Sequence, residues 1–216
     1  MKKYELTAEF IEKWGKKLFR IKALISFGSV EAGKLGGYVE KEDNLAQDGD
    51  AWVYGDAWVC GNAWVCGNAR VYGNARVYGN ARVYGNARVY GNAWVCGNAE
   101  VYGNAEVYGN AEVYGDAWVC GNARVYGDAR VCGDAWVYGD ADYLLIGRIG
   151  SRFSFTTFFK NKDKGITVSC GCFLGTIAEF RAKVTDTHGN NKHAKMYNLA
   201  ADMAELQILG EEILTS

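Results

Sequence analysis

The side chains that could do chemistry are concentrated in the last third of the chain, around three predicted strands and the start of a predicted helix. They are Arg152, Thr156, Thr157, Ser169, Cys170, Thr176 and His188. If the first and third strands pair, Arg152 and Cys170 approach the helix N-terminus that Thr176 caps, where backbone N–H groups favour an anion. These residues therefore predict a site for a nucleotide or another small anionic ligand.

Two other interpretations of these residues stay open. Cys170 could act as a nucleophile with His188 as its base, although no third group is identified that would orient the pair. Alternatively, the threonines are ordinary strand residues, the cysteines belong to the core and His188 lies in a solvated turn. Cys170 and Cys172 are one residue apart, which fits neither a Cys-x-x-Cys redox motif nor half of a standard zinc site. We therefore predict no catalytic residue, no metal site and no cofactor.

A hexapeptide repeat fills the middle of the chain. Residues 49–144 form sixteen hexapeptide units without an insertion or deletion, with the pattern Gly-(Asn or Asp)-Ala-x-Val-(Tyr or Cys), which only the last unit breaks, where Tyr143 replaces the Val. Such a strict period predicts a solenoid, because a unit this short must stack on its own copies to bury an apolar face. In an extended unit Ala and Val point to one side, so they are the predicted core. The Gly-Asn or Gly-Asp pair tolerates the positive φ that a sharp corner needs.

The register of the repeat resembles that of the hexapeptide-repeat left-handed β-helix superfamily. An aliphatic residue is followed four positions later by a small one, as in Val53 and Ala57. The resemblance implies three hexapeptides per triangular turn, and so about five turns. The stretches Gly36-Gly37-Tyr38-Val39 and Asn44-Leu45-Ala46 also resemble the opening of a bacterial and phage subgroup whose members are usually labelled transferases or polymer-forming proteins.

The predicted fold is mainly β, with a left-handed parallel β-helix between an N-terminal β cap and a small C-terminal α+β domain. The boundaries we expect are 1–48 for the cap and a first irregular coil, 49–144 for the repeats and 145–216 for the last domain.

The N-terminal segment does not repeat. Apolar residues alternate over 17–27, which predicts a strand that covers the first turn of the coil. Residues 7–14 are interpreted as one or two helical turns with the first residue as N-cap. Val39 and Leu45 fall in the six-residue phase of Ala51, so the coil is expected to begin with larger residues in the alanine positions.

Beyond the repeats the pattern changes to three strands and two helices. The strands are predicted at 142–149, 152–159 and 165–172, and the helices at 176–184 and 192–209. The apolar stripe expected to bury the second helix consists of Met196, Leu199, Ala200, Met203, Leu206 and Ile208 or Leu209.

An eighteen-residue turn also predicts which outward side chains are neighbours. Opposite charges are expected to meet at Arg88, Glu106, Arg124 and Asp142, at Glu112 and Arg130, and at Arg82 and Glu100, with Arg76 between two Trp rings. One interpretation is that these rows only support the sheets. The other is an aromatic surface for a partner, and the most apolar side carries Trp64, Tyr84, Tyr102, Trp118, Trp136 and Tyr138. We expect a homo-oligomer, with a trimer favoured, and this side in its interface.

Composition narrows the classes of partner. With 24 basic and 25 acidic residues the net charge is −1, which argues against nucleic acid or an anionic membrane held by bulk electrostatics. No run of about 18 apolar residues occurs and the N-terminus is charged, so a cytoplasmic protein is expected. The coil cysteines never occupy adjacent turns of one side, which places them too far apart for a disulfide.

Three functions follow. The favoured one is a non-enzymatic binding or scaffold protein, with the coil as spacer and oligomerisation surface and the last domain as the recognition unit. The second is a phage protein that sequesters a host nucleotide signal. The third, implied by the resemblance, is an acyltransferase that uses coenzyme A. Those enzymes place a catalytic histidine on the coil or on an inserted loop, and this coil has neither.

Overall fold

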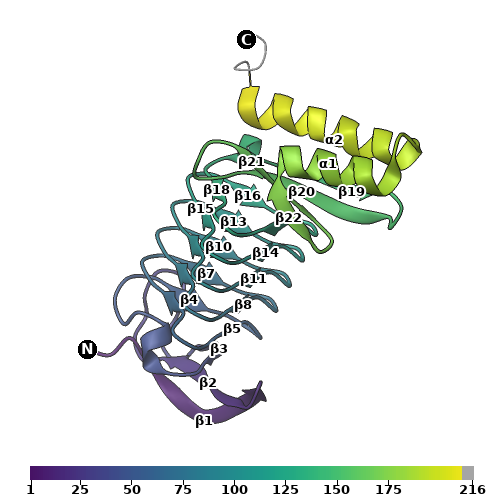
Figure 1. Ribbon diagram of the computed structural model, residues 1–216. Helices are drawn as coiled ribbons and strands as arrows, with labels where there is room; N and C mark the ends of the chain where they lie inside the picture. Colours follow the sequence, from purple (N-terminus) through teal and green to yellow (C-terminus); the bar gives the residue numbers. More distant parts are fainter. Residues whose placement is uncertain (211–216) are drawn as a thin grey trace.

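The computed structural model describes residues 1–210, which form a three-sided parallel β-solenoid between an N-terminal hairpin and a C-terminal sheet with two helices (Figure 1). Side one contains β4 (Trp52–Val53), β7 (Arg70–Val71), β10 (Arg88–Val89), β13 (Glu106–Val107) and β16 (Arg124–Val125). Side two contains β5 (Trp58–Val59), β8 (Arg76–Val77), β11 (Trp94–Val95), β14 (Glu112–Val113) and β17 (Arg130–Val131). Side three contains β6 (Trp64–Val65), β9 (Arg82–Val83), β12 (Glu100–Val101), β15 (Trp118–Val119) and β18 (Trp136–Val137).

The interior of the coil consists of the repeated Ala and Val, as predicted. Val89 is fully buried and lies between Val71 and Val107 of the turns before and after it. The backbone joins the same turns, since the N–H of Arg88 donates to the carbonyl of Ala105 at 2.9 Å. Each inner layer is therefore packed between two neighbouring layers.

Glycine and asparagine have different structural roles at the corners of the coil. Gly91 has a φ of +70°, and a β-carbon there would lie 3.0 Å from the backbone nitrogen of Gly109. Asn92 does not share this backbone conformation. Its amide instead donates to Asn110 at 3.1 Å and accepts from Asn74 at 3.1 Å, which makes a ladder of side-chain hydrogen bonds along the corner. Both residues of the Gly-Asn or Gly-Asp pair were expected to tolerate positive φ at the corner, and only the glycine adopts it.

The N-terminus extends side two by three strands. They are β1 (Tyr4–Lys13), β2 (Lys16–Ala23) and β3 (Leu35–Val39), where β1 and β2 are antiparallel, β2 and β3 are antiparallel, and β3 runs parallel to β5. The strand predicted over 17–27 is confirmed as far as Ala23, but the helix predicted over 7–14 is wrong. Trp14 and Gly15 both take positive φ, as in a two-residue hairpin turn, so residues 4–13 pair with β2 instead of forming helical bonds.

The first turn of the coil is irregular in a way that the repeat did not predict. Val39 pairs with Val59, and Leu45 forms a bridge to Val65. Both residues therefore stack on the inward Val positions, not on the Ala positions expected for them. The phase shifts because the segment after Leu45, which follows the 3-10 helix Glu42–Asn44, is two residues longer than a hexapeptide step. The five regular layers are thus preceded by a further, irregular one.

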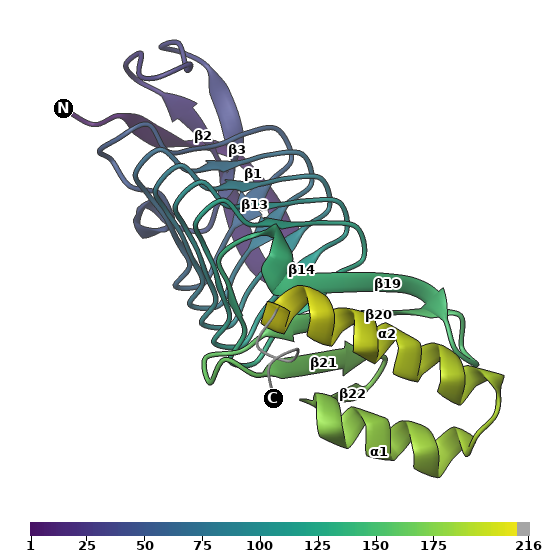
Figure 2. The same ribbon diagram turned by 90° about the horizontal axis from the view of Figure 1, so that it is seen from above.

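The C-terminal part is an antiparallel sheet covered by two helices. The strands are β19 (Tyr143–Ile149), β20 (Ser154–Lys160), β21 (Ile166–Cys170) and β22 (Phe173–Thr176), in that order, after the 3-10 helix Asp140–Asp142. The helices are α1 (Ile177–His188) and α2 (Lys192–Leu209). Figures 1 and 2 show the sheet between the end of the coil and the helices. Neither described helix has the length and apolar character that a bilayer span requires.

Most of the elements predicted here are confirmed to within a few residues, but their arrangement differs from the prediction. The first and third strands do not pair, because β20 lies between β19 and β21, and β22 was not predicted. Consecutive residues of β20 face different partners: Phe159 joins the core of the coil, and Phe158 packs with Phe180 of α1. The last six residues of the expected domain lie outside the described ones.

The apolar stripe predicted for α2 is wrong for most of its large residues. Four of its members are exposed, with exposed fractions of 40% for Met196, 63% for Leu199, 56% for Met203 and 57% for Leu206, whereas Ala200 and Ile208 are buried as predicted. The buried face consists of Ala194, Tyr197, Ala200, Ala201, Ala204 and Ile208. Alanines let the helix lie close to the sheet. A prediction based on large apolar residues therefore misses this face.

The outward charges pair largely as the eighteen-residue spacing predicts. Arg88 meets Glu106 at 3.1 Å, and the pairs Arg82–Glu100 and Arg130–Glu112 also form. The Arg76 guanidinium lies 5.8 Å from the Trp58 ring and 4.8 Å from the Trp94 ring. Arg124 departs from the prediction, since it binds Asp140 at 2.7 Å. Asp142 instead accepts the N–H groups of Tyr138 and Gly139.

The stacked tyrosines predict a loss of stability at alkaline pH. Burial and a hydrogen bond to Glu100 raise the pKa of Tyr84 to about 12, and burial also raises the pKa of Tyr72 and Tyr90. Because the unfolded chain titrates near pH 10, it loses protons that the folded chain keeps. The free energy of unfolding should therefore fall as the pH rises from about 10 to 12.

Tyrosinate absorbance and circular dichroism, followed together in an alkaline titration, test this prediction. In denaturant the tyrosines should titrate near pH 10, whereas in the native protein a large fraction should titrate only as the coil unfolds. A Tyr84→Phe variant should lose stability less steeply with pH. Native tyrosines that all titrate near pH 10, with the fold intact, would contradict the prediction.

Candidate functional site

Three of the predicted ligand residues meet in one hollow of the C-terminal domain. Arg152, Cys170 and His188 line a cavity of about 240 Å³. It lies between the β21–β22 hairpin, the loop before β20 and the C-terminal end of α1, and its walls include Lys183, Phe173, Phe180 and Tyr197. We call this cavity the basic hollow.

Thr176 does not belong to the basic hollow, and the anion site predicted at its helix N-terminus is wrong. The Thr176 hydroxyl accepts from the N–H of Glu179 at 3.2 Å, and the Glu179 carboxylate accepts from the N–H of Thr176 at 2.8 Å. This capping box satisfies the helix end and places a negative charge there. The basic hollow lies at the opposite end of α1, because β22 runs the chain away from Cys170 before the helix begins.

The remaining predicted residues hold the sheet together and join it to the coil. Thr156 is fully buried and donates to the Cys170 sulfur at 3.2 Å. The hydroxyl of Thr157 accepts from the backbone N–H of Arg130 at 3.0 Å, which fixes β20 on side two of the coil. Ser169 is buried on β21. Thr157 and Ser169 also line a second cavity, which adjoins the basic hollow at Ser154 and Gly171.

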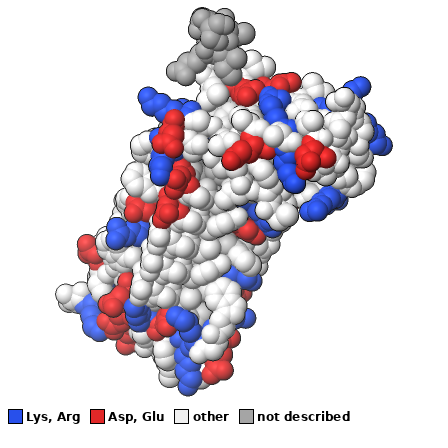
Figure 3. Space-filling model, viewed as in Figure 1, with Lys and Arg blue, Asp and Glu red and all other residues white. Residues whose placement is uncertain are grey.

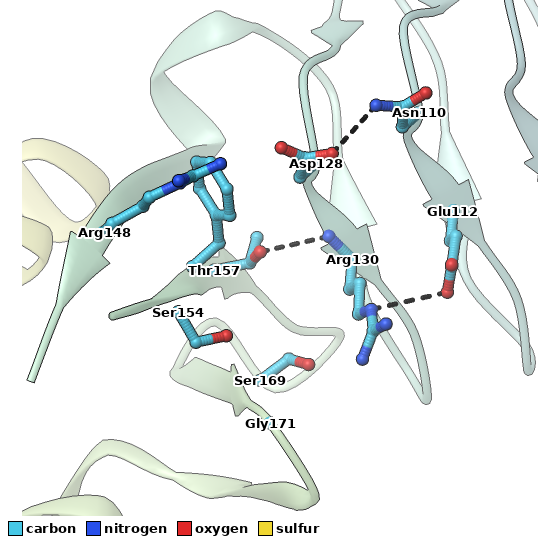
Figure 4. A pocket seen from close by; sticks show the side chains of 10 residues that line it. Asn110, Glu112, Asp128, Arg130, Arg148, Ser154, Thr157, Ser169 and Gly171 are labelled. Atoms are coloured by element: carbon cyan, nitrogen blue, oxygen red, sulfur yellow. Dashed lines mark hydrogen bonds and ion pairs between the residues drawn. The ribbon is translucent and has the colours of Figure 1, made fainter. Parts of the chain in front are cut away.

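This second cavity is a polar cleft of about 420 Å³ between side two and the C-terminal sheet. Figure 4 shows Glu112 and Arg130 on the coil, and Ser154 and Ser169 on the sheet, around the opening. Its charges balance, because Arg130 binds Glu112 at 3.4 Å and the other two charged linings, Asp128 and Arg148, have opposite signs. Thr157 and Ser169 were predicted as site residues, but the cleft itself was not, since its walls come from segments of the coil and of the sheet that are far apart in the sequence.

Side three carries a continuous aromatic row. The rings of Tyr84 and Tyr102 stack at 4.9 Å, and the row continues through Trp118 and Trp136 to Tyr138 with centroid distances of 6.4, 5.6 and 5.5 Å. Trp118 and Trp136 border a shallow hollow of about 380 Å³. Trp64, the first aromatic residue of this side, is 43% exposed. All six residues predicted for an interface thus lie on one side of the coil.

The cysteines of the coil are poor nucleophiles. Burial raises the pKa of the Cys60 thiol to about 11 and also raises the pKa of Cys120 and Cys132. All seven cysteines are free thiols. Cys172, at the rim of the basic hollow, is exposed. Within residues 1–210 no group of three or more His, Cys, Asp or Glu side chains is arranged to hold a metal ion.

Charges of both signs are mixed over the surface. On the face seen in Figure 3, Lys and Arg side chains lie beside Asp and Glu side chains on both the coil and the helices. This face therefore offers no broad area of one sign to a polyanion.

Comparison with known proteins finds a family model that matches part of the coil. The YdcK beta solenoid repeat model matches the coil over residues 63–79, 69–83, 81–97, 117–133 and 123–139. No curated protein matches the chain. The matched residues lie on all three sides of the coil and include neither the N-terminal hairpin nor the C-terminal sheet and helices. Together with the stacked parallel strands, the match identifies the coil as that of a β-solenoid repeat protein.

Proposed function

We propose that the protein is a non-enzymatic scaffold that assembles through side three of the coil and carries a recognition domain at one end. One observation supports this most: the segments outside the repeat cover aromatic residues of sides one and two, whereas Trp64, Trp118 and Tyr138 of side three stay exposed. On side two, Trp14 of the hairpin packs on Trp58 with ring centroids 4.9 Å apart. On side one, Trp52 is fully buried and touches Phe27.

The exposed aromatic residues of the coil are concentrated on one side. Of the large apolar residues of the coil with high exposure, Trp64, Trp118 and Tyr138 belong to side three and Tyr126 alone to side one. Contiguous exposed apolar surface on a soluble protein usually marks a contact with a partner. A flat three-sided coil offers this row to further copies of itself, and the resemblance to left-handed β-helix proteins, which are typically trimers, favours three copies.

Replacement of the most exposed aromatic residues of side three should dissociate the assembly. A Trp118→Ser, Tyr138→Ser double variant should sediment as a monomer at concentrations where the wild type is an oligomer. These two residues are 39% and 49% exposed, so the coil itself should keep its circular dichroism and most of its stability. Trp136 is less suitable, since its indole nitrogen is buried.

Tyr126→Ser provides the matched control. Tyr126 is 48% exposed, as much as Tyr138, but lies on side one, and its replacement should leave the oligomer unchanged. A wild-type chain that sediments as a monomer at high micromolar concentration would overturn the proposal. If Tyr126→Ser dissociated the oligomer equally, the interface could not be assigned to side three.

A second candidate function is the sequestration of a small anion by the C-terminal domain, as in a phage protein that removes a host nucleotide signal. The basic hollow supports it, because Arg152 and Lys183 face it. A histidine-dependent acyl transfer along the coil has less support, since His188 and His193 both lie in the C-terminal domain.

A further inference from the structure

The basic hollow is lined by cations and by neutral side chains. Arg152, Lys183 and His188 line it, and its described lining contains no Asp or Glu. The ion pairs of the C-terminal domain within residues 1–210 are made by Lys160, Lys162, Arg181 and Lys183. The Arg152 guanidinium therefore has no carboxylate partner among these residues. Lys183 pairs only with Asp186, at 3.2 Å and with both side chains largely exposed, an interaction that contributes little. Both cations are therefore available to a ligand.

Aromatic rings form the floor of the hollow. Phe180 lies 5.7 Å from Phe173 and 5.6 Å from Tyr197, and the His188 ring stacks on Tyr197 at 5.8 Å. The phenol of Tyr197 is close to Arg152, whose charge opposes the rise that burial causes in the pKa of Tyr197. A flat apolar group can therefore pack on the rings while an attached anion reaches Arg152.

A glycine beside the hollow leaves space for the Tyr197 ring. Gly150 has a φ of +73°, and a β-carbon there would collide with the Tyr197 phenol. Gly171, in the β21–β22 turn, has a φ of +61°, and a β-carbon there would lie at ordinary contact distance from the Arg152 guanidinium. Phe153, next to Arg152, takes a φ of +47° and is 72% exposed. Strained backbone of this kind clusters at ligand-binding and active sites.

We infer that the basic hollow binds a small organic anion that has one carboxylate or phosphate group and one apolar ring. The volume of about 240 Å³ is below the range of about 300–1,000 Å³ that drug-sized ligands occupy, so a single-ring anion fits and coenzyme A does not. The inference goes beyond the scaffold function, because binding needs only the side chains of one chain.

Benzoate and phenyl phosphate are suitable probes, with amide chemical shifts of the full chain as the readout. Both should shift resonances of the β21–β22 hairpin and the C-terminal end of α1 in a saturable way. Benzyl alcohol, which has the ring alone, and inorganic phosphate, which has the charge alone, should bind more weakly than either probe. If one of the two ring anions binds clearly more tightly, that result identifies the anionic group.

Arg152→Gln should weaken binding of the ring anions about tenfold to a hundredfold, as expected for loss of one charged hydrogen bond. Arg148→Gln is the matched control, because it removes the same charge from the neighbouring polar cleft and should leave binding unchanged. Arg152→Lys should restore part of the affinity. Equal loss in the Arg148 and Arg152 variants, or no saturable shift in the hollow with either probe, would overturn the inference.

The two proposals can fail separately. The Trp118→Ser, Tyr138→Ser variant should bind benzoate as the wild type does, and Arg152→Gln should sediment as the wild type does. Loss of binding on dissociation would show that the hollow depends on a second chain, and so contradict a site built from one chain.

Discussion

Val89→Asp should lower the free energy of unfolding by several kcal/mol, on the order of 3 to 5. Val89 is fully buried between Val71 and Val107, and the described core around it consists of Ala and Val side chains that cannot solvate a carboxylate. The chain must either bury an unpaired charge or raise the pKa of the new carboxyl group. Urea unfolding followed by circular dichroism measures the loss.

Arg76→Ala is the control for this experiment. Arg76 faces outward between Trp58 and Trp94, and partly exposed contacts of this kind contribute about 1 kcal/mol or less. If Val89→Asp were soluble with an unchanged unfolding midpoint, the valines could not be the interior of the coil. A larger loss with Arg76→Ala than with Val89→Asp would have the same meaning.

Gly37→Val should detach the N-terminal cap from the first regular layer, at a cost of about 3 kcal/mol. On β3 the backbone at Gly37 lies directly on the coil, where a β-carbon would collide with the carbonyl oxygen of Ala57 and lie 2.7 Å from a methyl carbon of Val53. Neither neighbour can move, since both belong to the buried interior. Hydrogen exchange should therefore accelerate in β1 to β3 before it does in the middle of the coil.

Leu35→Ala tests the same strand without the collision. Leu35 is 47% exposed, so its replacement should change the stability by about 1 kcal/mol or less. Wild-type protection of β1 to β3 in Gly37→Val would show that the cap does not close on the coil at this point.

The coil could be predicted in detail because one local rule repeats. The alternation of Ala, an outward residue and Val determines which side chains are buried, and the spacing of eighteen residues determines which pairs, such as Arg88 and Glu106, are neighbours. The ends could not be predicted in this way, because their conformations depend on contacts between distant segments. The Trp14–Gly15 turn and the shift of Val39 onto Val59 are examples.

The candidate site could be predicted only in part, because it too depends on contacts between distant segments. The residue types at Arg152, Cys170 and His188 indicated an anion site, and the fold places these three around one hollow. Thr176 was assigned to it on the assumption that the first and third strands pair, whereas β20 separates them. The stripe predicted for α2 was wrong at Met196, Leu199, Met203 and Leu206, because alanines allow the helix to approach the sheet closely and these larger residues remain outside.

Because the coil is a stack of identical layers, the number of repeat units determines both the distance and the relative rotation of its two ends. Adding eighteen residues inserts one layer, so the C-terminal domain moves about 4.8 Å further from the cap and keeps its orientation. Adding six residues also turns the domain by about a third of a revolution, onto another side of the rod. Duplication of repeat units can thus vary the spacing and the facing of the two ends separately, while Ala, Val and the asparagine ladders accept each new unit unchanged.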